Sequence, residues 1–163
     1  MIKEIKITDK MLLSARKKAK ELGRLHNSIS KGKGNLCGFL GEEVAMKVLK
    51  NAEISNTYEY DILLENGETV DVKSKHTSVA PKGHYDCSVS NHNIKQECDY
   101  YAFVRVKMDY TVAWFCGMVR KKDFFEEAYF AKKGEVDSDN NYVVKADCYQ
   151  LKIDQLRENA YAA

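Results

Sequence analysis

Residues 58–75 read YEYDILLENGETVDVKSK, and this stretch places two short apolar runs on either side of an Asn-Gly pair. An Asn-Gly pair between apolar runs is a strong sequence indication of a β-hairpin. The first arm carries Asp61, and the second carries Asp71 and Lys73, which share a face because they are two residues apart in a strand. Acidic groups inside an apolar hairpin are costly to bury unless something binds them, and a divalent cation would do so.

The length of the turn determines whether Asp61 can join that face, because a slip of one residue turns every side chain to the opposite side. A two-residue Asn-Gly loop places Asp61 opposite Val72, facing away from Asp71. A three-residue loop with Gly67 in the left-handed conformation places Asp61 directly opposite Asp71. We expect the three-residue loop with its glycine bulge, because only this register brings the two carboxylates together.

The composition is typical of one soluble globular domain. The chain has 163 residues, of which 44% are apolar and 31% charged. It has no apolar run near the roughly 20 residues of a membrane span and no charged-then-apolar leader, so we expect a cytoplasmic protein with no membrane partner. The five cysteines are scattered and include no Cys-x-x-Cys pair, which argues against a zinc site or a disulfide framework.

The net charge of +2 is unevenly distributed. Residues 1–34 contain ten lysine or arginine residues and three acidic ones, so this arm is basic and the remaining chain is acidic overall. A basic arm suggests a polyanionic partner, although a solvated lysine-rich helix face would give the same pattern. The cations expected to contact nucleic acid are Arg16, Lys17, Lys18, Lys20, Lys31, Lys33 and Lys75.

Two helices are expected before the hairpin. The first is capped by Thr8 or Asp9 and runs to about Leu22, and its apolar stripe is Leu12, Ala15, Ala19 and Leu22. A basic, glycine-rich segment at 27–38 then suits either a phosphate or a plain linker.

The second helix, at about 36–50, is apolar nearly all round and should be central and buried. Helical phase places Glu42 on its buried side and Glu43 on a polar face with Lys47. A buried carboxylate needs a partner, so Glu42 is the unusual residue of this helix.

The rest of the chain alternates between strands and helices. Strands are expected at 85–90, 100–107 and 111–119, a helical segment at 91–98, a helix at 122–132, a solvated acidic loop at 135–141, and a last strand with a C-terminal turn within 142–156. This order indicates an α/β fold with a central mixed sheet of four to five strands flanked by helices. We expect a single domain, with the basic helix and glycine-rich loop at 1–34, a core at 36–120, and a C-terminal helix and strand at 121–163.

Three acids and a lysine form the candidate catalytic set: Glu42, Asp61, Asp71 and Lys73. Asp61, Asp71 and the backbone carbonyl of Val72 are the expected ligands of Mg²⁺, for which Mn²⁺ can substitute, while Glu42 binds through water or holds a second metal. Such a metal polarises a phosphoryl oxygen and acidifies water, and a neighbouring lysine stabilises the developing charge or assists the water.

This pattern resembles the PD-(D/E)XK nuclease superfamily of phage and prokaryotic type. In that superfamily a helix supplies a glutamate, a strand supplies an aspartate, and the next strand carries a D/E-x-K signature. The corresponding segments here are GFLGE ending at Glu42, the Tyr60-Asp61 pair, and the triplet DVK from Asp71 to Lys73. Tyr60 stands where a proline often precedes the first aspartate of the superfamily.

The resemblance implies a restriction-endonuclease-like core and a Mg²⁺-dependent deoxyribonuclease that acts on DNA. An endonuclease is favoured over an exonuclease, although the sequence does not separate the two. It also allows a homodimer, and it makes Gln96 a candidate for an accessory role. The structure of the DNA substrate stays open at this point: duplex, flap, junction and single strand are all compatible.

A catalytically inactive nucleic-acid-binding or regulatory module of the same fold is the competing hypothesis. The basic arm would serve such a module equally well. The D/E-x-K triplet alone is not specific, since Glu4-Ile5-Lys6 also matches it. A metal-dependent cleavage assay separates the two hypotheses.

Overall fold

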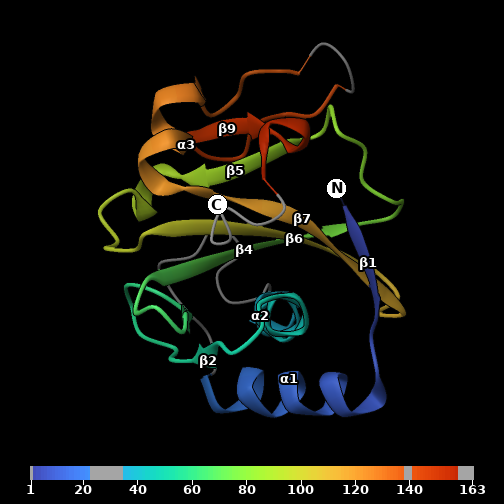
Figure 1. Ribbon diagram of the computed structural model, residues 1–163. Helices are drawn as coiled ribbons and strands as arrows, with labels where there is room; N and C mark the ends of the chain where they lie inside the picture. The colour runs from blue at the N-terminus through green and yellow to red at the C-terminus, as the bar shows by residue number, and fades with distance from the viewer. Residues whose placement is uncertain (1, 23–34, 138–140, 158–163) are drawn as a thin grey trace.

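A six-stranded sheet forms the centre of the computed structural model, which describes residues 2–22, 35–137 and 141–157 (Figure 1). The strand order is β1-β7-β6-β4-β3-β2, and β4 and β6 are parallel while the other neighbours are antiparallel. The strands are β1 Lys3–Lys6, β2 Glu53–Ile54, β3 Ile62–Leu63, β4 Thr69–Thr77, β6 Tyr100–Lys107 and β7 Val112–Arg120. The predicted α/β class with a mixed sheet is therefore confirmed, but the central sheet has six strands rather than four or five.

The hairpin between β3 and β4 has the expected register, which the Asn-Gly turn alone left open and the candidate carboxylate site required. Ile62 lies opposite Val70, and the Leu64 amide donates a hydrogen bond of 2.8 Å to the Glu68 carbonyl. Gly67 has a φ of +85°, a backbone conformation that glycine adopts without strain. The loop therefore contains three residues and its glycine is left-handed, as expected.

Three helices accompany this sheet: α1 Asp9–Leu22, α2 Asn35–Val48 and α3 Lys121–Glu127. α2 lies between α1 and the sheet, so it is enclosed on two sides (Figure 1). Thr8 caps α1 as predicted, because its hydroxyl oxygen accepts a hydrogen bond of 3.2 Å from the Met11 amide. The buried residues of α1 are Met11 and Ala15, whereas Leu22 is exposed, so the predicted apolar stripe is correct only in part.

α2 packs unusually close to β4 at Gly41. A Cβ atom at this position would lie 1.7 Å from the Ser74 hydroxyl oxygen, a distance at which no side chain fits. A Cβ atom at Gly38, one helical turn earlier, would have no neighbouring atom within 4 Å. Gly41 therefore sets the distance between the helix and the strand that carries the candidate D-x-K triplet.

A second, three-stranded antiparallel sheet covers the opposite face of the central sheet. Its order is β5-β9-β8, with β5 Asp86–Ser90, β8 Tyr129–Ala131 and β9 Cys148–Lys152. Together with α3 it buries an apolar core that includes Tyr101, Phe103, Phe124 and Leu151. The central sheet is thus flanked by helices on one face and by a small sheet and a short helix on the other.

Several predicted elements of the second half need correction. The predicted strand at 85–90 belongs to the second sheet. The predicted helix at 122–132 ends at Glu127, because the run Tyr129–Ala131 forms β8 and pairs with β9. The helical segment at 91–98 is only one 3₁₀ turn, Asn91–Asn93, and a second such turn, Ile153–Gln155, follows β9. The acidic loop at 135–141 contains a bridge between Val136 and Val143, and residues 138–140 lie outside the described residues. None of the described helices is long and apolar enough to cross a membrane.

Candidate active site

The hairpin brings Asp61 and Asp71 close together. The paired ladder ends at Ile62–Val70, and the Asp61 amide donates a hydrogen bond of 3.0 Å to the Val70 carbonyl. The Asp61 carboxylate accepts a hydrogen bond of 2.7 Å from the Val72 amide of β4. It therefore lies beside β4 and next to Asp71, whose charge raises the pKa of Asp61.

Lys73 lies immediately beside Asp71. Its ammonium nitrogen is 2.5 Å from the Asp71 Oδ2 atom, an ion pair whose angles fall outside hydrogen-bond geometry. Asp71 itself is only 4% exposed. The same ammonium donates a hydrogen bond of 3.2 Å to Gln96 Oε1 and lies 5.9 Å from the centre of the Tyr101 ring. Lys73 is thus held at the carboxylate pair from several directions.

Gln96 connects Lys73 to two other segments. Its side-chain nitrogen donates to the Tyr58 carbonyl at 2.6 Å, in the loop that leads to Asp61. Its backbone carbonyl accepts from the Lys121 ammonium at 2.5 Å. Gln96, for which an accessory role was expected, therefore contacts Lys73 directly. Lys121 was not anticipated from the sequence, where it is one member of a basic run at the end of a strand.

Glu42 is buried, as helical phase predicted. It is 6% exposed, and its Oε2 atom has no hydrogen-bond partner among the described residues. Burial, followed by the charge of Asp61, raises the pKa of Glu42 from 4.5 to about 8. Burial, followed by the charge of Asp71, raises the pKa of Asp61 from 3.8 to about 7. These carboxyl groups therefore repel one another, and a cation between them would relieve that repulsion.

Glu43 has a different partner from the one expected. The Glu43 carboxylate accepts hydrogen bonds from the Ser14 hydroxyl at 2.9 Å and from the Lys18 ammonium at 3.2 Å. Both partners belong to α1, so Glu43 joins the two helices and does not form the predicted pair with Lys47 within α2. The prediction was wrong because a helical wheel contains no information about which neighbouring helix packs against it.

The cations expected to bind nucleic acid are distributed over several regions. Arg16, Lys17 and Lys20 are exposed on α1, whereas Lys18 is engaged by Glu43. The Lys75 ammonium lies 4.5 Å from the centre of the Tyr142 ring, and burial lowers the pKa of Lys75. Lys31 and Lys33, together with most of the glycine-rich segment at 27–38, lie outside the described residues.

A further group of cations lies at the junction of β7 and α3. Arg120, Lys121 and Lys122 line a hollow of about 470 Å³ that also includes Cys98. Lys121 reaches from this hollow to the Gln96 carbonyl, and Arg120 is paired with Glu68 at 3.0 Å. These cations border the Asp71–Lys73 side of the site. They are not among the cations that the sequence indicated for nucleic-acid binding.

The oxygen atoms of the site are of the kind that bind a hard cation, but they are not arranged as a complete metal site. Within the described ranges, no three His, Cys, Asp or Glu side chains form an arrangement that could hold a metal ion. Asp61 and Asp71 nevertheless lie close enough for the charge of Asp71 to raise the pKa of Asp61, and Mg²⁺ is usually held by one or two carboxylates, with waters and substrate phosphates completing its shell. Glu42 has a buried oxygen that accepts no hydrogen bond from the described residues and is a hard donor of the kind that this ion prefers, whereas the Asp71 Oδ2 atom is already paired with the Lys73 ammonium.

Comparison with known proteins leaves the family open. No family model matches the chain, and no curated protein matches it in sequence. The functional argument therefore depends on the side chains of the site.

Proposed function

We propose that this protein is a Mg²⁺-dependent deoxyribonuclease of the PD-(D/E)XK type, built on a restriction-endonuclease-like core. The observation that supports this most is the proximity of Asp61 and Asp71, with Lys73 held beside Asp71, at the point where β3 leaves β4. The buried Glu42, whose charge interacts with Asp61, completes the acidic side of the site. DNA is the proposed partner, with endonucleolytic cleavage and a homodimer as parts of the same proposal.

Asp61, Asp71 and the Val72 carbonyl would hold Mg²⁺, with Mn²⁺ as a substitute. When bound there, the ion polarises a phosphoryl oxygen and acidifies water. Asp61 is already oriented by the Val72 amide, which limits its motion. Asp61 therefore needs little further ordering to accept a cation, whereas Asp71 would exchange its contact with the Lys73 ammonium for the ion.

The remaining residues act on the phosphate and the attacking water. The Lys73 ammonium supplies positive charge where negative charge accumulates during phosphodiester cleavage, and it can orient the water that attacks. Gln96 fixes the position of that ammonium. Glu42 lies farther from the position of the metal, where its carboxyl group can bind a water molecule and take up or release a proton.

One observation favours the alternative of an inactive nucleic-acid-binding module. The Lys73–Asp71 ion pair satisfies both groups without a metal, as a purely structural pair would. In that case the protein would bind DNA through its cations, and Mg²⁺ would not change the DNA.

The test is incubation with plasmid, linear duplex, single-stranded and junction DNA, each with Mg²⁺, with Mn²⁺ and with chelator. We expect cleavage that needs the metal and that is lost in Asp71→Asn, a variant of the same shape without the charge. Lys73→Ala should lose turnover but keep metal affinity, because an ammonium is not a ligand of Mg²⁺. DNA binding without cleavage under every condition would establish the inactive module instead.

A further inference from the structure

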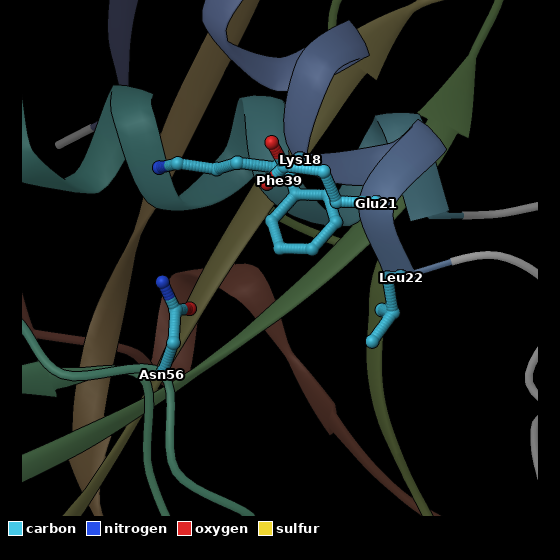
Figure 2. A pocket seen from close by; sticks show the side chains of 5 residues that line it. All are labelled: Lys18, Glu21, Leu22, Phe39 and Asn56. Atoms are coloured by element: carbon cyan, nitrogen blue, oxygen red, sulfur yellow. The ribbon is translucent and has the colours of Figure 1, made fainter.

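A second hollow lies on the α2 side of the candidate site. It has a volume of about 310 Å³ and is lined by Lys18, Glu21, Leu22, Phe39 and Asn56. Figure 2 shows the Phe39 ring at its centre, with Asn56 facing the two helices from the opposite wall. The hollow is shallow and widely open to solvent, so it suits a flat group that lies against the Phe39 ring rather than a ligand that must be enclosed.

This hollow adjoins the carboxylates of the site. Phe39 precedes Glu42 by three residues in α2, so the two side chains are neighbours on one side of that helix. The Asn56 amide donates a hydrogen bond of 3.2 Å to the Asp61 carbonyl, which fixes this wall of the hollow to the hairpin. A molecule bound here is therefore within reach of a group held at the carboxylates.

The lining offers the contacts that a nucleobase requires. An aromatic ring provides a surface on which any base can stack, and an amide and a carboxylate can bond to the polar edge of a base. Asn56 is exposed, so its side-chain amide is accessible to a ligand, and its backbone has a φ of +48°, which asparagine tolerates better than most residues. The carboxylate of Glu21 would repel a phosphate but can accept a hydrogen bond from a base amino group.

We propose that this hollow receives one unpaired base of a DNA strand whose neighbouring phosphate lies at Asp61 and Asp71. The inference rests on the proposed function and specifies its substrate class as DNA with unpaired nucleotides: single-stranded ends, flaps or junctions. A base in an intact duplex would first have to leave its stack, at a cost of a few kcal/mol. Unpaired DNA escapes this cost and therefore binds better.

The experiment measures DNA binding in chelator, so that its outcome does not depend on cleavage. The probes are a single-stranded oligonucleotide containing 2-aminopurine, whose fluorescence reports stacking, and a duplex of the same sequence. We expect the wild type to prefer the single strand. Phe39→Leu, which stays apolar but cannot stack, should lower affinity for the single strand about tenfold, with little change for the duplex. Phe130→Leu, at a half-exposed aromatic residue of β8, is the matched control and should change neither.

Two further variants test the same hollow if Phe39→Leu folds poorly. Phe39→Trp should retain or increase single-strand affinity, because it enlarges the stacking surface. Asn56→Gly removes the amide while suiting the left-handed backbone, and it should weaken single-strand binding.

Unchanged single-strand affinity in both Phe39→Leu and Asn56→Gly would overturn the base pocket. An equal loss of affinity for single strand and duplex would overturn the requirement for an unpaired base. Failure of the proposed nuclease function gives a different result, in which Phe39-dependent binding persists but no DNA is cleaved in Mg²⁺.

Discussion

Glu42 and Glu43 are adjacent in the sequence but have opposite surroundings. Glu42 faces the interior, where one of its oxygens has no partner among the described residues, and Glu43 is bonded to Ser14 and Lys18 of α1. The two residues thus provide a matched pair in which the same substitution tests a proposed catalytic role and a structural one.

We expect Glu42→Gln to lower cleavage by orders of magnitude without lowering the melting temperature, because the amide keeps the shape but removes the charge. Glu43→Gln keeps an acceptor for Ser14 and loses only a partly exposed ion pair, so it should cost less than about 1 kcal/mol of stability and leave cleavage unchanged. Steady-state cleavage and thermal unfolding of the two variants measure this. If the two phenotypes are exchanged, Glu43 is the carboxylate of the site.

The raised pKa values of Glu42 and Asp61 predict how stability depends on pH. Between about pH 4 and pH 8 the folded protein binds protons more tightly at these groups than the unfolded chain does. Their contribution to the free energy of unfolding is therefore fully present below pH 4 and is lost as the pH rises through about 7 to 8. Thermal unfolding in chelator from pH 5 to pH 8 measures the slope.

Asp61→Asn should flatten that slope, because asparagine does not titrate and its oxygen can still accept from the Val72 amide. Mg²⁺ should raise the melting temperature of the wild type more at pH 8 than at pH 5, since protons compete with the metal. A slope that is identical in wild type and variant would show that Asp61 titrates normally.

At the scale of elements, the close packing of α2 on β4 determines where Glu42 lies. Gly41→Ala would drive a methyl group into Ser74, and overpacking of this kind costs about 1–3 kcal/mol. Because α2 must move away from β4, we also expect a fall in cleavage larger than the loss of stability explains. Melting temperature and cleavage rate at a temperature well below unfolding measure the two effects.

Gly38→Ala is the matched control for this prediction. It lies in the same helix with open space around it, so alanine should stabilise the helix by roughly 0.5–1 kcal/mol and leave cleavage unchanged. Ser74→Gly should restore the Gly41→Ala variant, because it removes the atoms that the new methyl group meets. Equal behaviour of Gly38→Ala and Gly41→Ala would contradict the role assigned to this packing.

The features that local chemistry governs could be predicted from the sequence. The Asn-Gly turn indicated a hairpin, the expected pairing of the two carboxylates selected its three-residue loop, and helical phase placed Glu42 on the buried side of α2. Features that depend on distant partners could not be predicted in this way. The Glu43–Lys18 contact and the pairing of β8 with β9 depend on which segments pack together, and a short run such as Tyr129–Ala131 is compatible with either helix or strand.

At the scale of the whole molecule, the distribution of charge predicts the salt dependence of DNA binding. Arg16, Lys17 and Lys20 are exposed on α1, the outermost helix, next to the hollow proposed to receive a base (Figure 1). Changing all three to glutamine should flatten the plot of log affinity against log salt by about one unit for each DNA phosphate that these cations neutralise. Lys18 is left unchanged because it is bonded to Glu43.

The control neutralises three exposed lysines that precede β5 or follow β8, namely Lys82, Lys132 and Lys133. It changes the net charge by the same amount but should leave the slope nearly unchanged, because these positions are remote from the proposed DNA path. An equal effect of the two triple variants would mean that DNA responds only to total charge.

The central claim is that the hairpin brings Asp61 and Asp71 together to hold a divalent cation. The most direct measurement is anomalous scattering from crystals soaked in Mn²⁺, for the wild type and for Asp71→Asn. We predict a manganese peak between the two carboxylates in the wild type and none there in the variant. An absent peak in the wild type at saturating Mn²⁺, or an unchanged peak in the variant, would contradict the claim.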